Sequence, residues 1–169
     1  MKKTLQKINL LVKLGIIEKY AIAGGIAQFY YIEPSITYDL DLIVHIVGEE
    51  SSLNPLAKIY EWAKENYYEF IGEYIIIEGI PVQFLLAYNE LVKEALDNSN
   101  KIILYDEDTY IIKPEYLMAI MLQTGRSKDK ERLAKFFKEA EYDNDFFFKI
   151  LDRFDLLKSF YKLKEKFDE

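Results

Sequence analysis

Residues 23–42 of this chain read AGGIAQFYYIEPSITYDLDL, and this stretch decides the fold. Asp39 and Asp41 are spaced i, i+2 in an apolar segment typical of a strand, so both carboxylates point from one face with Cα atoms ~6.5 Å apart. Two like charges side by side on a sheet raise each other's pKa and cost stability unless a cation is bound between them. Carboxylate oxygens in this arrangement suit Mg²⁺, which can bridge two acidic side chains and the phosphates of a nucleotide.

A pair of glycines precedes the two aspartates. Gly24 and Gly25 follow the short apolar run Tyr20–Ala23 and open a segment with a helical pattern. Glycines let phosphate groups approach the backbone amides at the N-terminus of a helix. The same glycines also permit a tight turn from a strand into a helix, and that structural role is compatible with phosphate binding. The stretch therefore predicts a combined phosphate and metal site.

The order of these motifs resembles the nucleotidyltransferase superfamily of the DNA polymerase β type. Members carry Gly-Gly or Gly-Ser, about nine to thirteen residues, and then Asp-x-Asp. Within the superfamily the chain looks like the small toxin-type proteins of the AbiEii and minimal nucleotidyltransferase groups. The resemblance spans roughly residues 20–137 and is carried by Gly24-Gly25-Ile26-Ala27, Thr37-Tyr38-Asp39-Leu40-Asp41 and Arg126-Ser127-Lys128-Asp129.

The resemblance implies a reaction and a set of site residues. Members transfer a nucleotidyl group from a nucleoside triphosphate to a hydroxyl group, with Mg²⁺ or Mn²⁺ as the cofactor. The implied residues are the catalytic and metal-binding Asp39 and Asp41, and the nucleotide-binding Gly24, Gly25, Thr37, Arg126 and Lys128. In the last motif, Arg126 and Lys128 would neutralise phosphate charge. The motif could instead be the solvated start of a helix, because charged helix faces are common.

One position departs from the pattern of the superfamily. Active relatives have a third carboxylate on the strand after a hairpin, and the corresponding segment here is Val82-Gln83-Phe84. An amide is a weaker metal ligand than a carboxylate and cannot act as a general base. Three interpretations stay open. The chain is an enzyme with an RNA, protein or small-molecule acceptor, a degenerate domain that binds a nucleotide or a partner without turnover, or a toxin–antitoxin component with an antitoxin as its protein partner.

Length and composition limit the alternatives. The 169 residues, 50% of them hydrophobic, predict a single domain over residues 1–169, with a core at about 20–112 and a helical part at about 114–166. The net charge of −7 argues against a nucleic-acid-binding surface over the whole molecule, although a local basic patch stays possible. The absence of cysteine excludes disulfides and thiolate chemistry. No segment resembles a signal peptide or a membrane span, so we expect a cytoplasmic protein with no membrane partner.

Hydrophobic periodicity and turn residues predict an α/β (α+β) fold, a mixed sheet flanked by helices. The predicted strands are Tyr20–Ala23, Asp39–Val47, Phe70–Ile77, Ile80–Leu86, Ile102–Tyr105 and Tyr110–Ile112, with a hairpin at Glu78-Gly79. The predicted helices are 4–18, Gly24–Ile32, Pro55–Asn66, Glu90–Leu96, Pro114–Leu122, 128–140 and 145–166, with a break at Glu33-Pro34-Ser35 and a cap at Ser127.

Overall fold

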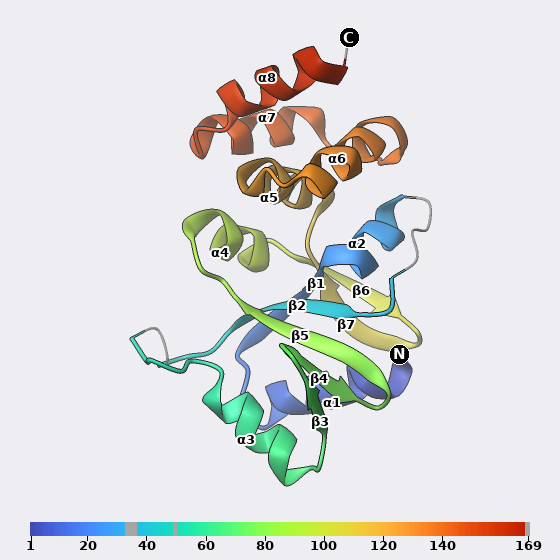
Figure 1. Cartoon of the computed structure of the whole chain (residues 1–169), viewed down its shortest axis with the longest axis vertical. Coiled ribbons are helices and arrows are strands. Elements are labelled where there is room, and N and C mark those ends of the chain that lie inside the picture. Colours follow the sequence, from blue (N-terminus) through green and yellow to red (C-terminus); the bar gives the residue numbers. More distant parts are fainter. Residues whose placement is uncertain (33–36, 49–50, 168–169) are drawn as a thin grey trace.

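The computed structural model describes residues 1–32, 37–48 and 51–167, which form a seven-stranded mixed sheet with helices on both faces (Figure 1). The strands are β1 (Lys19–Ala23), β2 (Leu40–His45), β3 (Glu69–Ile71), β4 (Tyr74–Ile77), β5 (Ile80–Leu86), β6 (Asn100–Leu104) and β7 (Glu107–Ile111). Their order across the sheet is β3-β4-β5-β2-β1-β7-β6. The pairs β2–β5 and β1–β7 are parallel, and the other neighbours are antiparallel. The predicted α/β class with a mixed sheet is confirmed.

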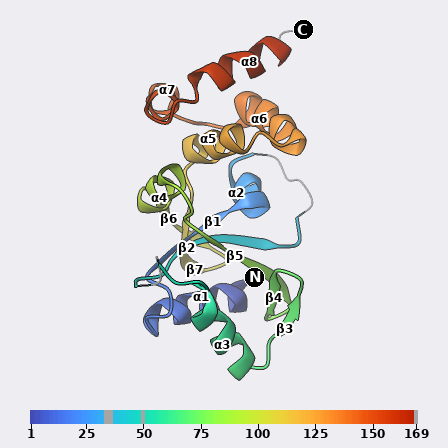
Figure 2. The same ribbon diagram turned by 60° about the vertical axis from the view of Figure 1, so that its left-hand side comes forward.

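The helices form two layers on the sheet and a stack beyond it. They are α1 (Lys2–Lys13), α2 (Gly24–Tyr31), α3 (Ala57–Glu65), α4 (Glu90–Asp97), α5 (Pro114–Thr124), α6 (Ser127–Glu139), α7 (Asn144–Arg153) and α8 (Leu157–Phe167). Helices α1 and α3 lie on one face of the sheet, whereas α2 and α4 lie on the other. The stack α5–α8 follows beyond α2 and α4 in both views (Figures 1 and 2).

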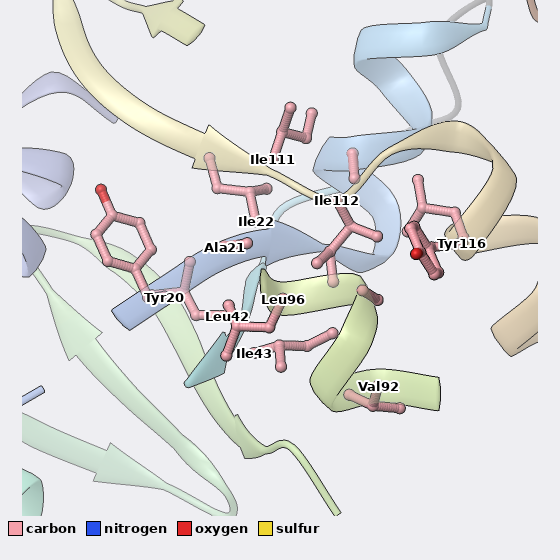
Figure 3. Packing of buried hydrophobic residues seen from close by; sticks show 14 of the residues in the cluster. Tyr20, Ala21, Ile22, Leu42, Ile43, Val92, Leu96, Ile111, Ile112 and Tyr116 are labelled. Carbon is pink, nitrogen blue, oxygen red and sulfur yellow. The ribbon is translucent and has the colours of Figure 1, made fainter. Parts of the chain in front are cut away.

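The central strands are buried because apolar side chains cover both of their faces. In β2, Leu40, Leu42 and Val44 are fully buried on one face, and Ile43 on the other face is 4% exposed. Leu96 of α4 packs over this second face near Ile43 (Figure 3). Since side chains alternate along a strand, Asp41 points to the same face as Ile43, toward α2 and α4.

The structure corrects three predicted elements. The predicted strand Phe70–Ile77 is two strands, β3 and β4, because the chain turns at Gly72 with a φ of +58°. The predicted helix 145–166 is two helices, α7 and α8, because Asp155 adopts a φ of +56° between them. The predicted helix 4–18 ends at Lys13.

Two further predictions concern the ends of helices. Ser127 is the first residue of α6 rather than its cap, a position that Arg126 holds. The predicted break at Glu33-Pro34-Ser35 lies outside the described residues. Within the described ranges, no helix combines the length and the apolar composition needed to cross a bilayer.

Candidate functional site

The turn from β1 into α2 brings the first glycine against the second aspartate. Gly24 has a φ of +56°, in the left-handed region that favours glycine. A Cβ atom built on Gly24 would lie 1.9 Å from Oδ2 of Asp41. Glycine is therefore required here for two reasons, the backbone conformation and the space that the Asp41 carboxylate occupies beside the start of α2.

The second glycine lies against the threonine of the Thr-x-Asp segment. A Cβ atom on Gly25 would lie 2.5 Å from Oγ1 of Thr37. The Thr37 hydroxyl donates a hydrogen bond of 3.0 Å to Oδ1 of Asp39. A larger residue at Gly25 would therefore displace Thr37, which orients Asp39, and would not simply enter open space.

The start of α2 offers backbone donors beside these carboxylates. Its N-cap residue, Ala23, provides no side-chain hydrogen bond to the first turn. The first amides of a helix have no partner within the helix, and the helix dipole favours negative charge at this end. The first turn of α2, at Gly24 and Gly25, thus presents backbone N–H groups that have no partner within the helix next to two carboxylates, a combination suited to phosphates that arrive together with a cation.

Asp41 is in an unfavourable environment for a carboxylate. Its Oδ1 atom is buried and has no hydrogen-bond partner within residues 1–32, 37–48 and 51–167. Burial, and secondly the charge of Asp39, raises the pKa of Asp41 from 3.8 to about 6. An unpaired buried carboxylate oxygen costs desolvation energy, so it needs a proton or a cation as a partner.

Asp39 accepts hydrogen bonds from two hydroxyl groups. Besides Thr37, the phenol of Tyr74 in β4 donates a hydrogen bond of 3.4 Å to Oδ2 of Asp39. Burial raises the pKa of Tyr74, and the charges of Asp39 and Asp41 raise it further, so the phenol stays protonated and donates. Sequence reasoning missed Tyr74. The pairing of β4 with β5 could have identified it. Ile75 lies opposite Val82 in this antiparallel pair, so the next position along places Tyr74 beside Gln83.

Three basic residues, Arg126 at the N-cap of α6 and Lys128 and Arg132 within the helix, influence the Asp41 carboxylate electrostatically. The charges of Arg132, Lys128 and Arg126 all lower the pKa of Asp41, against the larger effects of burial and Asp39. The predicted site included Arg126 and Lys128. Of the three cations, however, Arg132 lowers the pKa of Asp41 most. These side chains therefore act on the carboxylate of β2, which favours the functional interpretation of the motif over a solvated helix start.

A buried acid pairs with two of these cations and orients one of them. Asp129 is only 1% exposed and accepts hydrogen bonds from Nε and Nη2 of Arg126 at 2.7 and 3.2 Å. Arg132 Nη1 lies 3.9 Å from Oδ1 of the same residue. Bidentate pairing fixes the plane of a guanidinium group. Asp129 thus belongs to the support of the site, a role that the sequence prediction did not assign to it.

The register of the sheet places Gln83 where the resemblance puts a third carboxylate. Asp41 of β2 pairs with Gln83 of β5 on one side and with Ala23 of β1 on the other. Gln83 is therefore the direct neighbour of Asp41 on the same face of the sheet. Among the described residues, no cluster of three or more acidic or histidine side chains is placed to hold a metal ion. The site consequently offers two carboxylates and an amide.

Comparison with known proteins supports the fold. The structure is similar to the crystal structure of an antigenic nucleotidyltransferase-like protein from Paracoccidioides brasiliensis, with a TM-score of 0.54 and 13% sequence identity over 80% of this chain and 74% of that chain. At this identity the similarity shows a nucleotidyltransferase-like fold and does not extend to substrates. No protein-family model and no curated protein sequence matches the chain. Membership of the AbiEii or minimal toxin-type groups stays a prediction.

Proposed function

We propose that this chain is a nucleotidyltransferase that transfers a nucleotidyl group from a nucleoside triphosphate to a hydroxyl group of an acceptor. The observation that carries the proposal is Asp41, a carboxylate with one buried oxygen that finds no partner among the described residues, beside a second carboxylate and within the influence of three cations. A carboxylate with only a structural role is normally hydrogen-bonded or exposed. Asp41 is better explained as a group whose partner arrives with the substrate.

The donor set fits a hard divalent cation. Asp39 and Asp41 would hold Mg²⁺ or Mn²⁺, since both ions prefer carboxylate oxygens and Mg²⁺ usually takes few protein ligands together with water and substrate phosphates. When bound, the ion would polarise the α-phosphate and stabilise the pyrophosphate leaving group. In the part of the chain that the structure describes, Oδ1 of Asp41 is a buried carboxylate oxygen without a hydrogen-bond partner, and such a cation would supply one.

The residues of the chain would position the triphosphate. The amides at the start of α2 would donate to phosphate oxygens, while Arg126, Lys128 and Arg132 would offset the negative charge. Because Asp129 already holds the Arg126 guanidinium by two hydrogen bonds, this cation would need little rearrangement when the nucleotide binds. Most of the catalytic effect would come from positioning and charge neutralisation.

In the transfer itself, the acceptor oxygen forms a bond to the α-phosphorus as the bond to pyrophosphate breaks. The acceptor hydroxyl must also lose its proton. Gln83 cannot take this proton, since an amide has no basic site near neutral pH. The proton would pass to Asp39, to Asp41 or to a phosphate oxygen. The acceptor is a hydroxyl group of an RNA, a protein or a small molecule.

A second candidate function is nucleotide binding without turnover, and the observation that favours it is Gln83. The residue stands next to Asp41, where a third acid would assist both metal binding and proton removal. A site of this kind would still bind a nucleotide with its cation but would not transfer it. A toxin–antitoxin role, with an antitoxin as partner, stays a prediction from the resemblance.

Two measurements test the proposal. Thermal shift with Mg²⁺ and each nucleoside triphosphate measures binding, and transfer of label from α-³²P nucleotides to RNA or protein fractions measures turnover. Asp39→Asn and Asp41→Asn should abolish both signals. Asp152→Asn, which alters an exposed aspartate of α7, is the matched control and should retain both. Binding without label transfer would support the second candidate, and wild-type binding in both site variants would overturn both candidates.

A further inference from the structure

The stack of C-terminal helices contains a cavity of about 550 Å³ that has no part in the proposed reaction. It is lined by residues of α6, of the segment between α6 and α7, and of α7 and α8: Ala134, Phe137, Lys138, Tyr142, Asn144, Phe147, Phe148, Phe160, Lys164 and Phe167. On α6, a rotation of ~100° per residue places Ala134 and Phe137 on nearly the opposite side from Lys128 and Arg132. The cavity and the cations of the candidate site therefore lie on different sides of this helix.

The wall of the cavity is a network of aromatic rings. Phe147 and Phe160 are buried, and their ring centroids are 5.9 Å apart with the planes at 79°. Phe137 contacts both of these rings, and Phe148 lies 5.2 Å from Phe160 at 84°. Rings that already brace one another form a preformed apolar surface, and a further flat ring can join it edge to face. The wall therefore favours an aromatic or similarly flat apolar guest.

The rim of the cavity is positively charged in a chain whose net charge is −7. Lys138 of α6 and Lys164 of α8 are both exposed and line the cavity. Within the described part of the chain, no acidic side chain lines the cavity and neither lysine forms an ion pair. Asn144 adds an amide at the same rim. These groups complement an anion.

We propose that this cavity, an aromatic pocket with two lysines at its rim, is a binding site for a small amphipathic organic anion. The flat apolar body of the ligand packs among Phe137, Phe147 and Phe148. Its carboxylate, sulfonate or phosphate group lies at the rim with Lys138 and Lys164. The volume falls in the range of about 300–1,000 Å³ that is usual for small-molecule sites. The inference is independent of the proposed transfer reaction.

A matched pair of fluorescent probes tests this assignment. The probes are 1-anilinonaphthalene-8-sulfonate (ANS) and N-phenyl-1-naphthylamine, which is the same ring system without the sulfonate. We expect one ANS molecule to bind per chain, about five- to tenfold more tightly than the neutral probe, which corresponds to a charge-assisted contact at an exposed rim. The double variant Lys138→Gln/Lys164→Gln should bind both probes with the affinity that the wild-type protein has for the neutral probe.

Two further variants localise the binding. Ala134→Phe should fill the cavity and abolish binding of both probes. Lys130→Gln/Lys162→Gln is the matched control. It removes one lysine from each of the same two helices, but these two lysines line a separate hollow of about 270 Å³. This control should leave the affinity for ANS unchanged. Thermal melts establish that each variant folds, and the surface lysine variants decide the outcome if Ala134→Phe does not fold. The proposal is overturned if the control weakens ANS as much as Lys138→Gln/Lys164→Gln, if nucleotide with Mg²⁺ displaces ANS, or if the two probes bind equally.

Discussion

Asp41 of β2 and Gln83 of β5 are direct neighbours on two parallel strands, and the register puts both side chains on the face of the sheet where Asp41 lies against the start of α2. The residue of β5 that lies nearest to the Asp41 carboxylate is therefore neutral. In-register neighbours on adjacent strands lie ~4.8 Å apart, close enough for two charges to interact strongly. The effect of a third acid at Gln83 on stability and on Mg²⁺ binding therefore tests whether this position faces the site.

Gln83→Asp should lower the free energy of unfolding of the metal-free protein by about 1 kcal/mol or more, because it adds a carboxylate beside a buried one. The same change should tighten Mg²⁺ binding in the presence of a nucleotide. Chemical denaturation and isothermal titration of Mg²⁺ measure the two effects. Gln83→Asn is the neutral control and should change neither. If the metal-free stability and the Mg²⁺ affinity both stay at wild-type values, Gln83 does not face the site.

Asp41→Asn should stabilise the metal-free protein near neutral pH. A pKa raised from 3.8 to about 6 corresponds to at most ~3 kcal/mol, of which solvent screens a part because the side chain is partly exposed. We expect a gain of about 1–2 kcal/mol in denaturant unfolding. Asp39→Asn should gain less, since its amide can accept only one of the two hydrogen bonds that Thr37 and Tyr74 donate to the carboxylate. Destabilisation by Asp41→Asn would mean that the carboxylate has a structural partner.

The stability of the wild-type protein relative to Asp41→Asn should fall as the pH rises through the window between about 4 and 6. The folded state holds a proton on Asp41 up to pH ~6, whereas the unfolded chain releases it near 3.8, so the folded state binds more protons in this window. The contribution is fully present below pH 4 and lost above pH 6. Urea unfolding of the wild type and of Asp41→Asn across this range isolates the effect, because only the difference between the two curves reports Asp41. A difference that does not change with pH would contradict the prediction.

The parts of the site that local geometry controls could be predicted from the sequence. Strand alternation places Asp39 and Asp41 on one face, and a glycine with positive φ suits the turn at Gly24, so neither inference needed the rest of the fold. Tyr74 could not be found in the same way. Its contact with Asp39 depends on a turn at Gly72 that splits one predicted strand into β3 and β4.

The electrostatic effect of the basic residues on Asp41 could not be predicted from local sequence, because it depends on how α6 packs against the rest of the fold. The sequence shows that Arg126, Lys128 and Arg132 share a charged segment, but only the tertiary arrangement shows that all three act on Asp41. The division of the last predicted helix had a similar cause. Asp155 adopts a left-handed conformation with no glycine or proline at the break to mark it.

Gly24→Ala should abolish nucleotide binding and destabilise the protein more than the matched change Gly72→Ala. The two glycines have nearly the same φ, +56° and +58°, so both alanine variants bear the same backbone strain of about 1 kcal/mol. A Cβ on Gly72 meets nothing within 4 Å, whereas a Cβ on Gly24 meets the Asp41 carboxylate. The difference between the two, about 1–3 kcal/mol in denaturant unfolding, reports the displacement of Asp41. Equal losses of stability with retained nucleotide binding would refute the contact.

Asp129→Asn should weaken binding of a nucleoside triphosphate with Mg²⁺, although it removes a negative charge close to the phosphates. If Asp129 contributed only charge, its neutralisation would tighten binding of the anionic ligand. Its two hydrogen bonds orient Arg126, however, so an amide that accepts only one of them should leave the guanidinium misplaced. The exposed Glu131 of the same helix is the control, because Glu131→Gln should tighten binding slightly. Isothermal titration with a non-hydrolysable triphosphate at low salt gives the sign of each change, and tighter binding by Asp129→Asn would show that Arg126 needs no support from this residue.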